Sequence, residues 1–349
     1  MNLLILGADS LTGRALTQLV QKEGLNHHAL STGEFLGLNK SDLTKTLTRL
    51  TPSMVIYVAR FSGLAQAEVD SEAARQCDQV NSLGVSSVAE LCAKLQVPLM
   101  FHSSSLVFDG TKAHPYEETD QANPRSRYGI SKLAGERAIR ELLPAHVILR
   151  TDWVFSAERT RYFRRLLSAF RENKGKVSVM SQRFCPTPAS DVARVLLAIA
   201  KQADCTGDVW GTYHYCALLP MSQEFFAEHV IQEAAKYDPE IAALLPKLEI
   251  EKLPANLPWI GNSVLSSQLL FETFGIKQRS RAAELNTILQ KLANFVPAPV
   301  VPDPVPAPEV VEEAGSPATA EPKTGGQKRR VRKKSGSARP AKKAEKQTK

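Results

Sequence analysis

The sequence predicts an α/β protein built on a doubly wound parallel sheet, followed by a smaller α/β region and a tail. Three observations support this prediction. Short apolar runs alternate with amphipathic helical segments along the first half of the chain. A glycine-containing turn, Gly7 to Gly13, directly follows the first apolar run. The last 53 residues are rich in proline and charge, and they cannot bury enough apolar surface to offset their ordering entropy.

Periodicity assigns each element of the first half. The apolar runs predict five strands, at residues 2–7, 27–31, 53–59, 97–105 and 146–155. The helical pattern predicts helices at residues 11–24, 41–50 and 126–143, and a long helical region that ends near residue 94. Gly24 ends the first of these helices, and Ser41 is a suitable N-cap for the second. Strands that alternate with helices in this way form parallel sheets with right-handed crossovers.

Composition excludes several classes of protein. Hydrophobic residues make up 43% of the chain and charged residues 23%, which are ordinary values for a globular protein. No run approaches the roughly 20 apolar residues of a membrane helix, and the N-terminal apolar run is too short for a secretory signal. The five cysteines are scattered without a Cys-x-x-Cys pair, so neither a metal site nor a disulfide framework is expected. We therefore expect a cytoplasmic protein with no membrane partner.

The turn "GADSLTG" lies between a strand and a helix, which is the context of a dinucleotide-binding loop. Gly7 allows the tight turn, and Gly13 allows the helix to pack closely on the strand. The helix N-terminus then offers N–H groups and a positive dipole to a diphosphate. Ser10 stands where the backbone approaches the phosphates, so either the loop backs off or the hydroxyl donates to a phosphate oxygen. The alternative is an ordinary strand–helix turn.

A second signal is the segment "RYGISK". Tyr128 and Lys132 are four residues apart on a predicted helix and therefore project from one face. Upstream, "HSSSLVFDG" ends a strand and supplies hydroxyls at Ser103, Ser104 and Ser105. A hydroxyl at a strand end followed by Tyr-x-x-x-Lys is the catalytic pattern of short-chain dehydrogenases. The alternative is a helix residue beside a solvated charge.

Further segments resemble one family of extended short-chain dehydrogenases, the RmlD-like dTDP-4-dehydrorhamnose reductases. "SSSLVFDG" resembles the family's "STDYVFDG", "YGISKLAGE" its "YG.SKLAGE", and "ILRTDWVF" its "I.RTSWVY". "PTPASDVARVL" is similar to its "PT...DLA", and "LPWIGNSVLSSQLL" to its terminal "RP.NS.L". The resemblance covers roughly residues 1–293 in order. It implies a Rossmann-type fold and hydride transfer from a nicotinamide cofactor to a keto-sugar nucleotide.

The resemblance also implies roles for individual residues. Tyr128 protonates the carbonyl oxygen, and Lys132 lowers the pKa of Tyr128 and binds the nicotinamide ribose. Ser104 orients the carbonyl, and neighbouring hydroxyls at Ser103 or Ser105 are expected to replace it in part. The implied substrate-binding residues are Ser105 and Trp153. The implied cofactor-binding residues are Gly7, Ser10, Leu11, Gly13, Asp42, Leu43, Val58, Ala59, Tyr128 and Lys132.

The cofactor is expected to be NADPH, with NADH as an alternative. An acid at the end of the second strand would bind the adenosine ribose and select NAD. Leu30, Ser31 and Thr32 carry no carboxylate, and Arg14 follows the loop. NADPH should therefore be accepted at least as well as NADH, with Asp42 and Leu43 at the adenine.

The sequence departs from the family pattern in four places. Tyr57, Val58 and Ala59 replace the family's "NAA" after the third strand, and these bulkier groups are expected to crowd the ribose side of the cofactor. Ser105 with Leu106 replaces an Asp–Tyr pair. Val264 stands where an arginine often binds a diphosphate, and Ser10 replaces a glycine. All four departures concern recognition of cofactor or substrate, and none belongs to the Ser104, Tyr128 and Lys132 set.

Three regions are expected along the chain. Residues 1–155 form the dinucleotide-binding region, residues 156–296 form mainly a substrate-binding region with interleaved elements, and residues 297–349 form a disordered tail. The second region contains predicted helices at 161–175, 190–202, 221–237 and 282–295 and strand-like pieces at 177–180 and 211–217. Residues 323–349 carry a net charge of +11 and residues 297–322 one of −5, so residues 1–296 carry only +2 of the total +8.

Three readings of function follow. The first is an NAD(P)H-dependent reductase of a nucleotide-sugar substrate. The second is a non-catalytic nucleotide- or partner-binding protein on the same fold. The third makes the basic tail the functional part, binding nucleic acid or another polyanion through charge without sequence preference. A homodimer is kept as an alternative to a monomer.

Overall fold

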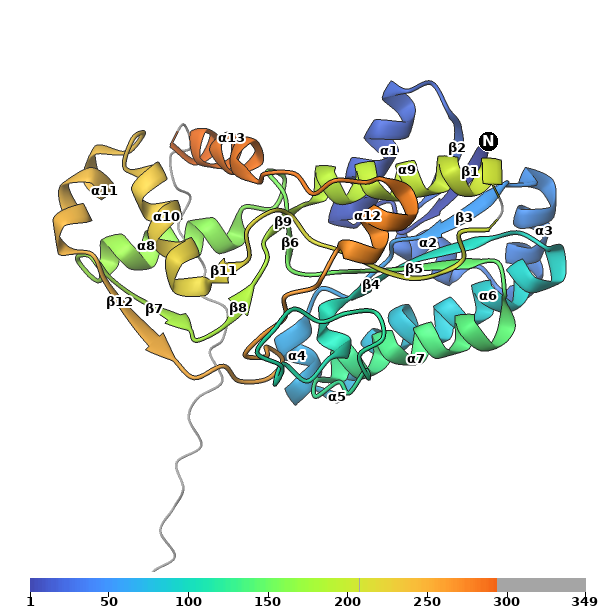
Figure 1. Cartoon of the computed structure of the whole chain (residues 1–349), viewed down its shortest axis with the longest axis horizontal. Helices are drawn as coiled ribbons and strands as arrows, with labels where there is room; N and C mark the ends of the chain where they lie inside the picture. The colour runs from blue at the N-terminus through green and yellow to red at the C-terminus, as the bar shows by residue number, and fades with distance from the viewer. Residues whose placement is uncertain (207, 294–349) are drawn as a thin grey trace, which may run out of the picture. The chain divides into compact units, whose positions relative to one another are not determined.

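A six-stranded parallel sheet is the largest sheet among the described residues (Figure 1). The computed structural model describes residues 1–206 and 208–293, and the predicted disordered tail therefore lies outside the described residues. In spatial order the strands are β10 (Gly211–Tyr215), β5 (His146–Thr151), β4 (Leu99–Ser104), β3 (Met54–Tyr57), β1 (Asn2–Leu6) and β2 (Asn26–Leu30).

Helices cover both faces of this sheet, because its central strands are apolar on both sides. Leu3 and Ile5 belong to one buried cluster, and Leu4 and Leu6 belong to the other. One cluster includes α1 (Leu11–Lys22), α9 (Ala189–Thr206) and α12 (Gln268–Phe274). The other includes α2 (Thr32–Gly37), α3 (Lys40–Leu50), α6 (Gly84–Leu95) and α7 (Arg127–Leu142). This is the predicted doubly wound α/β architecture.

The strand order reverses between β1 and β3. From β1 the chain continues to β2 on one side, and from β3 it continues through β4 and β5 to β10 on the other. In doubly wound sheets, ligands bind outside the carboxyl ends of the strands at this reversal. The loop after β1 and the residues after β3 therefore lie at the edge of the sheet where a ligand is expected.

A third cluster of buried apolar residues lies outside the sheet. It is formed by aromatic and aliphatic side chains such as Phe163, Phe170, Phe226 and Ile288. Its elements are α8 (Arg161–Glu172), β7 (Lys176–Met180), β8 (Arg183–Phe184), β11 (Met221–Ser222), α10 (Gln223–Ala234), α11 (Pro239–Leu244), β12 (Glu249–Leu253) and α13 (Ala282–Ala293). β7 pairs with β12, and β8 pairs with β11.

Several element boundaries differ from those predicted. Helix α3 begins at Lys40 because Asn39, rather than Ser41, is the N-cap and accepts the N–H of Asp42 at 2.9 Å. The predicted strand 146–155 is two strands, β5 and β6 (Val154–Phe155), and β6 pairs with β9 (Thr187–Pro188). The strand is interrupted where Asp152 accepts hydrogen bonds from neighbouring segments.

The long predicted helical region is four consecutive elements. They are α4 (Leu64–Val69), α5 (Ser71–Asp78), the π-helical η1 (Gln79–Leu83) and α6. The strand-like segment predicted at 211–217 is the sixth strand of the main sheet, β10, and α9 before it packs against α1. Among the described residues, none of the helices has the length and apolar character needed to cross a membrane.

Candidate active site

Helix α7 is held unusually close to the end of β4. Ser126 caps its N-terminus by accepting the N–H of Gly129 at 3.0 Å. A Cβ at Gly129 would lie 2.0 Å from the carbonyl oxygen of Leu106, so only glycine permits this approach. Leu106 belongs to the short 3₁₀ turn η2 (Ser105–Val107) that directly follows β4. The glycine therefore brings Tyr128 beside the predicted catalytic hydroxyls.

A cavity of about 350 Å³ lies at this place. The sheet and its loops supply Arg60, Ser104 and Ser105, and helix α7 supplies Tyr128 and Lys132. The third apolar cluster supplies side chains such as Tyr162 and Phe184. Trp153 also lines the cavity. The structure thus brings together the three predicted catalytic residues and both predicted substrate residues.

Lys132 is almost completely buried, with 1% of its surface exposed. Its Nζ donates to the carbonyl oxygen of His102 at 3.0 Å and lies 4.6 Å from the ring centroid of Phe101. Burial, together with the positive charge of Arg60, lowers the pKa of Lys132 to about 7. Near neutral pH this lysine is therefore poised between its charged and neutral forms.

Tyr128 is buried beside Lys132, whose Nζ lies 6.0 Å from the centroid of the tyrosine ring. Burial raises the pKa of Tyr128, and the charge of Arg60 acts in the opposite direction. The expected lowering of this pKa by Lys132 is therefore not what the structure gives. The physical reason is that burial desolvates the phenolate and so favours the neutral phenol.

The three serines at the end of β4 have different partners. Ser103 donates to Glu136 Oε1 at 2.6 Å, and Ser105 donates to Asp152 Oδ1 at 2.9 Å. Ser104 accepts the N–H of Leu106 at 3.2 Å and remains partly exposed to the cavity. The expectation that Ser103 or Ser105 can replace the Ser104 hydroxyl is therefore corrected, because both hydroxyls are already committed.

Glu136 anchors the helix that carries Tyr128 and Lys132. It lies one turn after Lys132, is fully buried, and accepts two hydrogen bonds from Arg150 on β5, at 2.9 and 2.7 Å. Arg140 donates to the same carboxylate at 2.9 Å. Burial alone would raise the pKa of Glu136, but its bonds to Arg150 and the nearby positive charges lower it. The carboxylate thus ties α7 to β4 and β5.

The loop after β1 has the geometry that its glycines predict. Gly7 adopts φ +94°, and a Cβ there would lie 2.2 Å from the backbone nitrogen of Ala59. A Cβ at Gly13 would lie 2.1 Å from the carbonyl oxygen of Gly7. Ser10 is the N-cap of α1 and accepts the N–H of Gly13 at 2.9 Å. Its oxygen therefore caps the helix, while its hydroxyl proton can still donate.

A carboxylate lies at the end of β2 that the local sequence did not reveal. Asp9, in the loop after β1, accepts the N–H and the hydroxyl of Thr32 at 2.6 and 2.8 Å. The two residues predicted to contact the adenine, Asp42 and Leu43, have other partners. Asp42 pairs with Lys45 on its own helix at 3.1 Å, and Leu43 is buried in the apolar core.

The residues after β3 divide between core and cavity. Tyr57 is fully buried between Phe35 and Phe101 and donates to the carbonyl oxygen of Val80. The expectation that Tyr57 crowds the cofactor is therefore wrong, because the strand directs this side chain into the core. Val58 and Ala59 are also buried in the two core clusters. Arg60, which the sequence did not single out, is the residue of this segment that lines the cavity.

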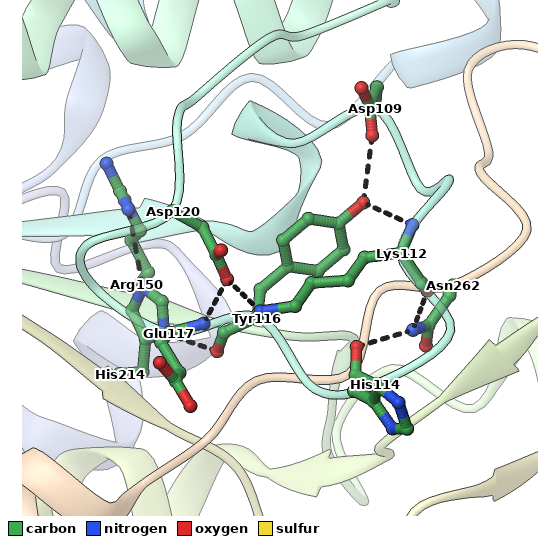
Figure 2. Close-up of polar contacts among 9 residues, drawn as sticks. All are labelled: Asp109, Lys112, His114, Tyr116, Glu117, Asp120, Arg150, His214 and Asn262. Carbon is green, nitrogen blue, oxygen red and sulfur yellow. Dashed lines mark hydrogen bonds and ion pairs between the residues drawn. The ribbon is translucent and has the colours of Figure 1, made fainter.

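A loop that follows η2 is fixed by the segment around residue 262 (Figure 2). Asn262 donates to the carbonyl oxygens of Lys112 and His114 at 2.7 and 3.1 Å, and Tyr116 donates to Asp109 at 2.8 Å. Val264, expected at the place of a diphosphate-binding arginine, is buried and accepts the N–H of Tyr116 through its carbonyl oxygen at 2.8 Å. The "NSVL" segment therefore holds the loop in place.

Comparison with known proteins agrees with this geometry. The family model of the RmlD substrate binding domain matches residues 1–294. A dTDP-4-dehydrorhamnose reductase of Sinorhizobium fredii is 32% identical over 244 residues, which cover 68% of this chain and 80% of the relative. The reductase of Aggregatibacter actinomycetemcomitans is 30% identical, and the match covers 79% of this chain and 94% of the relative.

Solved structures share the fold. A dTDP-4-dehydrorhamnose reductase from Clostridium acetobutylicum superimposes with a TM-score of 0.70 at 22% identity, covering 84% of this chain and 99% of its own. The Bacillus anthracis reductase, solved in complex with NADP, gives a TM-score of 0.66 at 20% identity and covers 83% of this chain and 99% of its own. From the family match over nearly all described residues, this chain belongs to the RmlD family of extended short-chain dehydrogenases/reductases.

Proposed function

We propose that this protein is an NAD(P)H-dependent reductase of a keto-sugar nucleotide, of the dTDP-4-dehydrorhamnose reductase type. The observation that supports it most is that Ser104, Tyr128 and Lys132 line one cavity at the carboxyl ends of the parallel strands. The curated relatives are named as reductases of this kind. A non-catalytic binding protein is not favoured, since all three residues of the reaction are present and share this cavity.

The loop after β1 fits a dinucleotide. The close packing of Gly7 and Gly13 turns the N-terminus of α1 toward the reversal of strand order, where N–H groups and the helix dipole attract a diphosphate. Gly7, Ser10, Leu11 and Gly13 would hold that diphosphate, and the backbone of Val58 and Ala59 would flank it. NADPH is the proposed cofactor and NADH the alternative; the carboxylate of Asp9 at the end of β2 removes the argument that no acid lies there, and it favours NADH. When bound, the nicotinamide supplies the hydride.

Residues of the chain itself supply the proton for the reduction and position the substrate carbonyl. The hydroxyl of Tyr128 donates its proton to the carbonyl oxygen of the substrate, and the raised pKa of Tyr128 keeps the phenol protonated at neutral pH. Lys132 holds the nicotinamide ribose and, in its charged form, stabilises the phenolate that remains. The Ser104 hydroxyl donates to the carbonyl oxygen and orients it.

The remaining cavity suits a sugar ring. Trp153 lines it and makes aromatic contacts with Tyr162 at 4.9 Å and with Phe184 at 5.8 Å between ring centroids. Such aromatic surfaces pack against the apolar faces of sugars. Ser105 acts here through its hydrogen bond to Asp152, which keeps a carboxylate at the cavity. We further place the enzyme in the cytoplasm, with a homodimer as the alternative to a monomer.

The test is reduction of dTDP-4-dehydrorhamnose by the full chain. Oxidation of NADPH and of NADH is followed by absorbance, and the sugar nucleotide product is identified by mass. Stoichiometric formation of the 4-hydroxy product supports the proposal. Binding of both nucleotides without turnover contradicts it and favours the non-catalytic reading.

The charge of the C-terminal segment favours a second, separate function. Residues 323–349 carry +11 and no aromatic side chain for stacking on bases. We propose that this segment binds polyanions through counterion release, without sequence preference. Full-length chain and a chain ending at residue 322 are compared on random-sequence DNA at several salt concentrations. Binding that persists without residues 323–349, or that does not weaken steeply with salt, contradicts this proposal.

A further inference from the structure

Arg60 brings a guanidinium to the active-site cavity, and within the described residues its buried Nε has no hydrogen-bond partner. It follows β3 by three residues and lines the cavity together with Tyr128 and Lys132. Its Nε is buried and makes no hydrogen bond within the described part of the chain. A buried guanidinium nitrogen without an acceptor destabilises the folded protein, and most buried polar groups therefore have a hydrogen-bond partner. A ligand is the natural acceptor at a cavity.

The carboxylate that lines the cavity is already engaged elsewhere. Asp152 accepts the hydroxyl of Ser105 through Oδ1 and the N–H of Cys185 through Oδ2. Lys132 adds a second positive group to the same wall, and its Nζ donates to a backbone carbonyl rather than to a carboxylate. Arg60 and Lys132 therefore face one space, and a bound anion would neutralise them.

The fold places Arg60 where a nucleotide is expected. The strand order reverses between β1 and β3, and Arg60 follows β3 at the carboxyl edge of the sheet. The preceding residue, Ala59, packs directly against Gly7 of the glycine loop. Arg60 thus stands between the loop that would hold the cofactor and the cavity that would hold the substrate.

We propose that the Arg60 guanidinium is a phosphate-binding group of this cavity, which pairs with the diphosphate of a bound nucleotide. The inference rests on the proposed function for the identity of the nucleotides, since both the dinucleotide cofactor and the nucleotide sugar carry a diphosphate. A guanidinium offers a planar fork of donors that matches two phosphate oxygens. A lysine at this place would keep the charge but lose the fork.

The experiment compares the full-length wild-type chain with Arg60→Met and Arg60→Lys. Arg49→Met is the matched control, because Arg49 is exposed on α3 and does not line the cavity. Calorimetry measures binding of NADPH, of thymidine diphosphate and of inorganic pyrophosphate. Thermal unfolding without ligand reports the cost of the unpaired charge. We expect Arg60→Met to keep or raise the melting temperature, since it removes a partly buried charge whose Nε has no hydrogen-bond partner among the described residues.

The expected result is that Arg60→Met weakens binding of at least one nucleotide by about 10- to 100-fold, the loss typical of a charged hydrogen bond. The affinity of Arg60→Lys should lie between those of the wild type and Arg60→Met. The affinity of Arg49→Met should match that of the wild type. Loss confined to NADPH assigns Arg60 to the cofactor, and loss confined to thymidine diphosphate assigns it to the substrate. Equal affinities of the wild type and Arg60→Met for all three ligands overturn the proposal.

The pyrophosphate arm separates this proposal from the proposed function. If the wild type binds neither nucleotide, the reductase proposal fails, and Arg60 is judged on pyrophosphate alone. Weaker pyrophosphate binding by Arg60→Met then supports a phosphate site, and unchanged or absent pyrophosphate binding overturns it. If Arg60→Met does not fold, Arg60→Lys decides by the same comparison.

Discussion

At the residue scale, the hydroxyl of Ser104 is not interchangeable with its neighbours. Ser103 is bonded to Glu136 and Ser105 to Asp152, so neither can turn toward a substrate without leaving a buried carboxylate short of a donor. Ser104 is the serine of this run that remains partly exposed to the cavity. We therefore propose that Ser104 alone of these three serines orients the substrate carbonyl.

Replacing this hydroxyl should be costly. We expect Ser104→Ala to lower kcat by about 10- to 100-fold, because a hydrogen bond to the charge that develops on the carbonyl oxygen is lost. Ser104→Thr, which keeps the hydroxyl, should retain most of the rate. Steady-state kinetics on the keto-sugar nucleotide measures both variants. A rate for Ser104→Ala equal to that of the wild type means that another group orients the carbonyl.

The bond between Ser105 and Asp152 explains one departure from the family pattern. The resembling segments have an aspartate at the position of Ser105 and a serine at that of Asp152, so the two residue types have changed places. In this chain a 2.9 Å hydrogen bond joins the Ser105 hydroxyl to the Asp152 carboxylate. Burial raises the pKa of Asp152 to about 6, so this bond is formed by a desolvated acid.

The exchange predicts strong coupling between the two positions. Ser105→Asp alone brings two carboxyl groups together, and Asp152→Ser alone removes the acceptor of two donors, so each variant should lose stability. The double variant Ser105→Asp/Asp152→Ser restores the pair in its other order and should recover about 1–3 kcal/mol relative to the sum of the single losses. Urea unfolding of the four proteins gives the coupling energy. Strictly additive losses rule out a retained pair.

Sequence reasoning at this scale succeeds where a local motif carries the chemistry. Tyr128 and Lys132 are one helical turn apart, so their shared face follows from spacing alone. The roles of Arg60, Asp9 and Glu136 could not be predicted from the sequence, because they depend on partners brought close by the fold. Asp9, for example, meets Thr32 across 23 residues of chain. The raised pKa of Tyr128 could not be predicted from the sequence either, since burial is a property of the folded molecule.

At the element scale, the site depends on the contact between α7 and η2. Gly129 permits it, and Glu136 fixes the helix to β4 and β5 through Ser103 and Arg150. The sequence predicts α7 to within one residue of each end, because its motif and capping residue are local. It did not place β10 in the main sheet, because the partner of a strand is set by long-range packing against β5.

The contact can be tested at its glycine. Gly129→Ala puts a methyl group 2.0 Å from the Leu106 carbonyl oxygen, and relieving that overlap should cost about 1–3 kcal/mol of unfolding free energy and most of the activity. Gly33→Ala is the matched control, since nothing lies within 4 Å of a Cβ there and Gly33 is also helical. Urea unfolding and kinetics measure both. Equal behaviour of the two variants argues against a required close approach.

At the scale of the whole molecule, the active site lowers the stability of the folded protein. Lys132 is buried with a folded-state pKa of about 7, whereas a lysine in an unfolded chain has a pKa near 10.5. Between these values the unfolded chain holds a proton that the folded protein does not. The contribution of Lys132 to stability therefore rises as the pH rises from about 7 to about 10.5.

Lys132→Met removes the part of the pH dependence of the unfolding free energy that comes from this lysine. The difference in unfolding free energy between the variant and the wild type should favour the variant most at pH 7 and below, and it should shrink as the pH approaches 10. Urea unfolding of both proteins at pH 6, 7, 8.5 and 10 measures it. A difference that stays constant over this range means that the lysine keeps its charge in the folded protein.

The central claim is that this cavity performs a reduction in which Tyr128 supplies the proton. The most direct measurement is kcat for NADPH oxidation with dTDP-4-dehydrorhamnose by the wild type, Tyr128→Phe and Tyr162→Phe. Tyr162 lines the same cavity and undergoes the same chemical change, but it is not on α7 beside Lys132. We predict that Tyr128→Phe lowers kcat by about 10²–10⁴-fold with NADPH binding retained, while Tyr162→Phe stays near the wild type in kcat. Equal kcat values for the wild type and Tyr128→Phe would contradict this account.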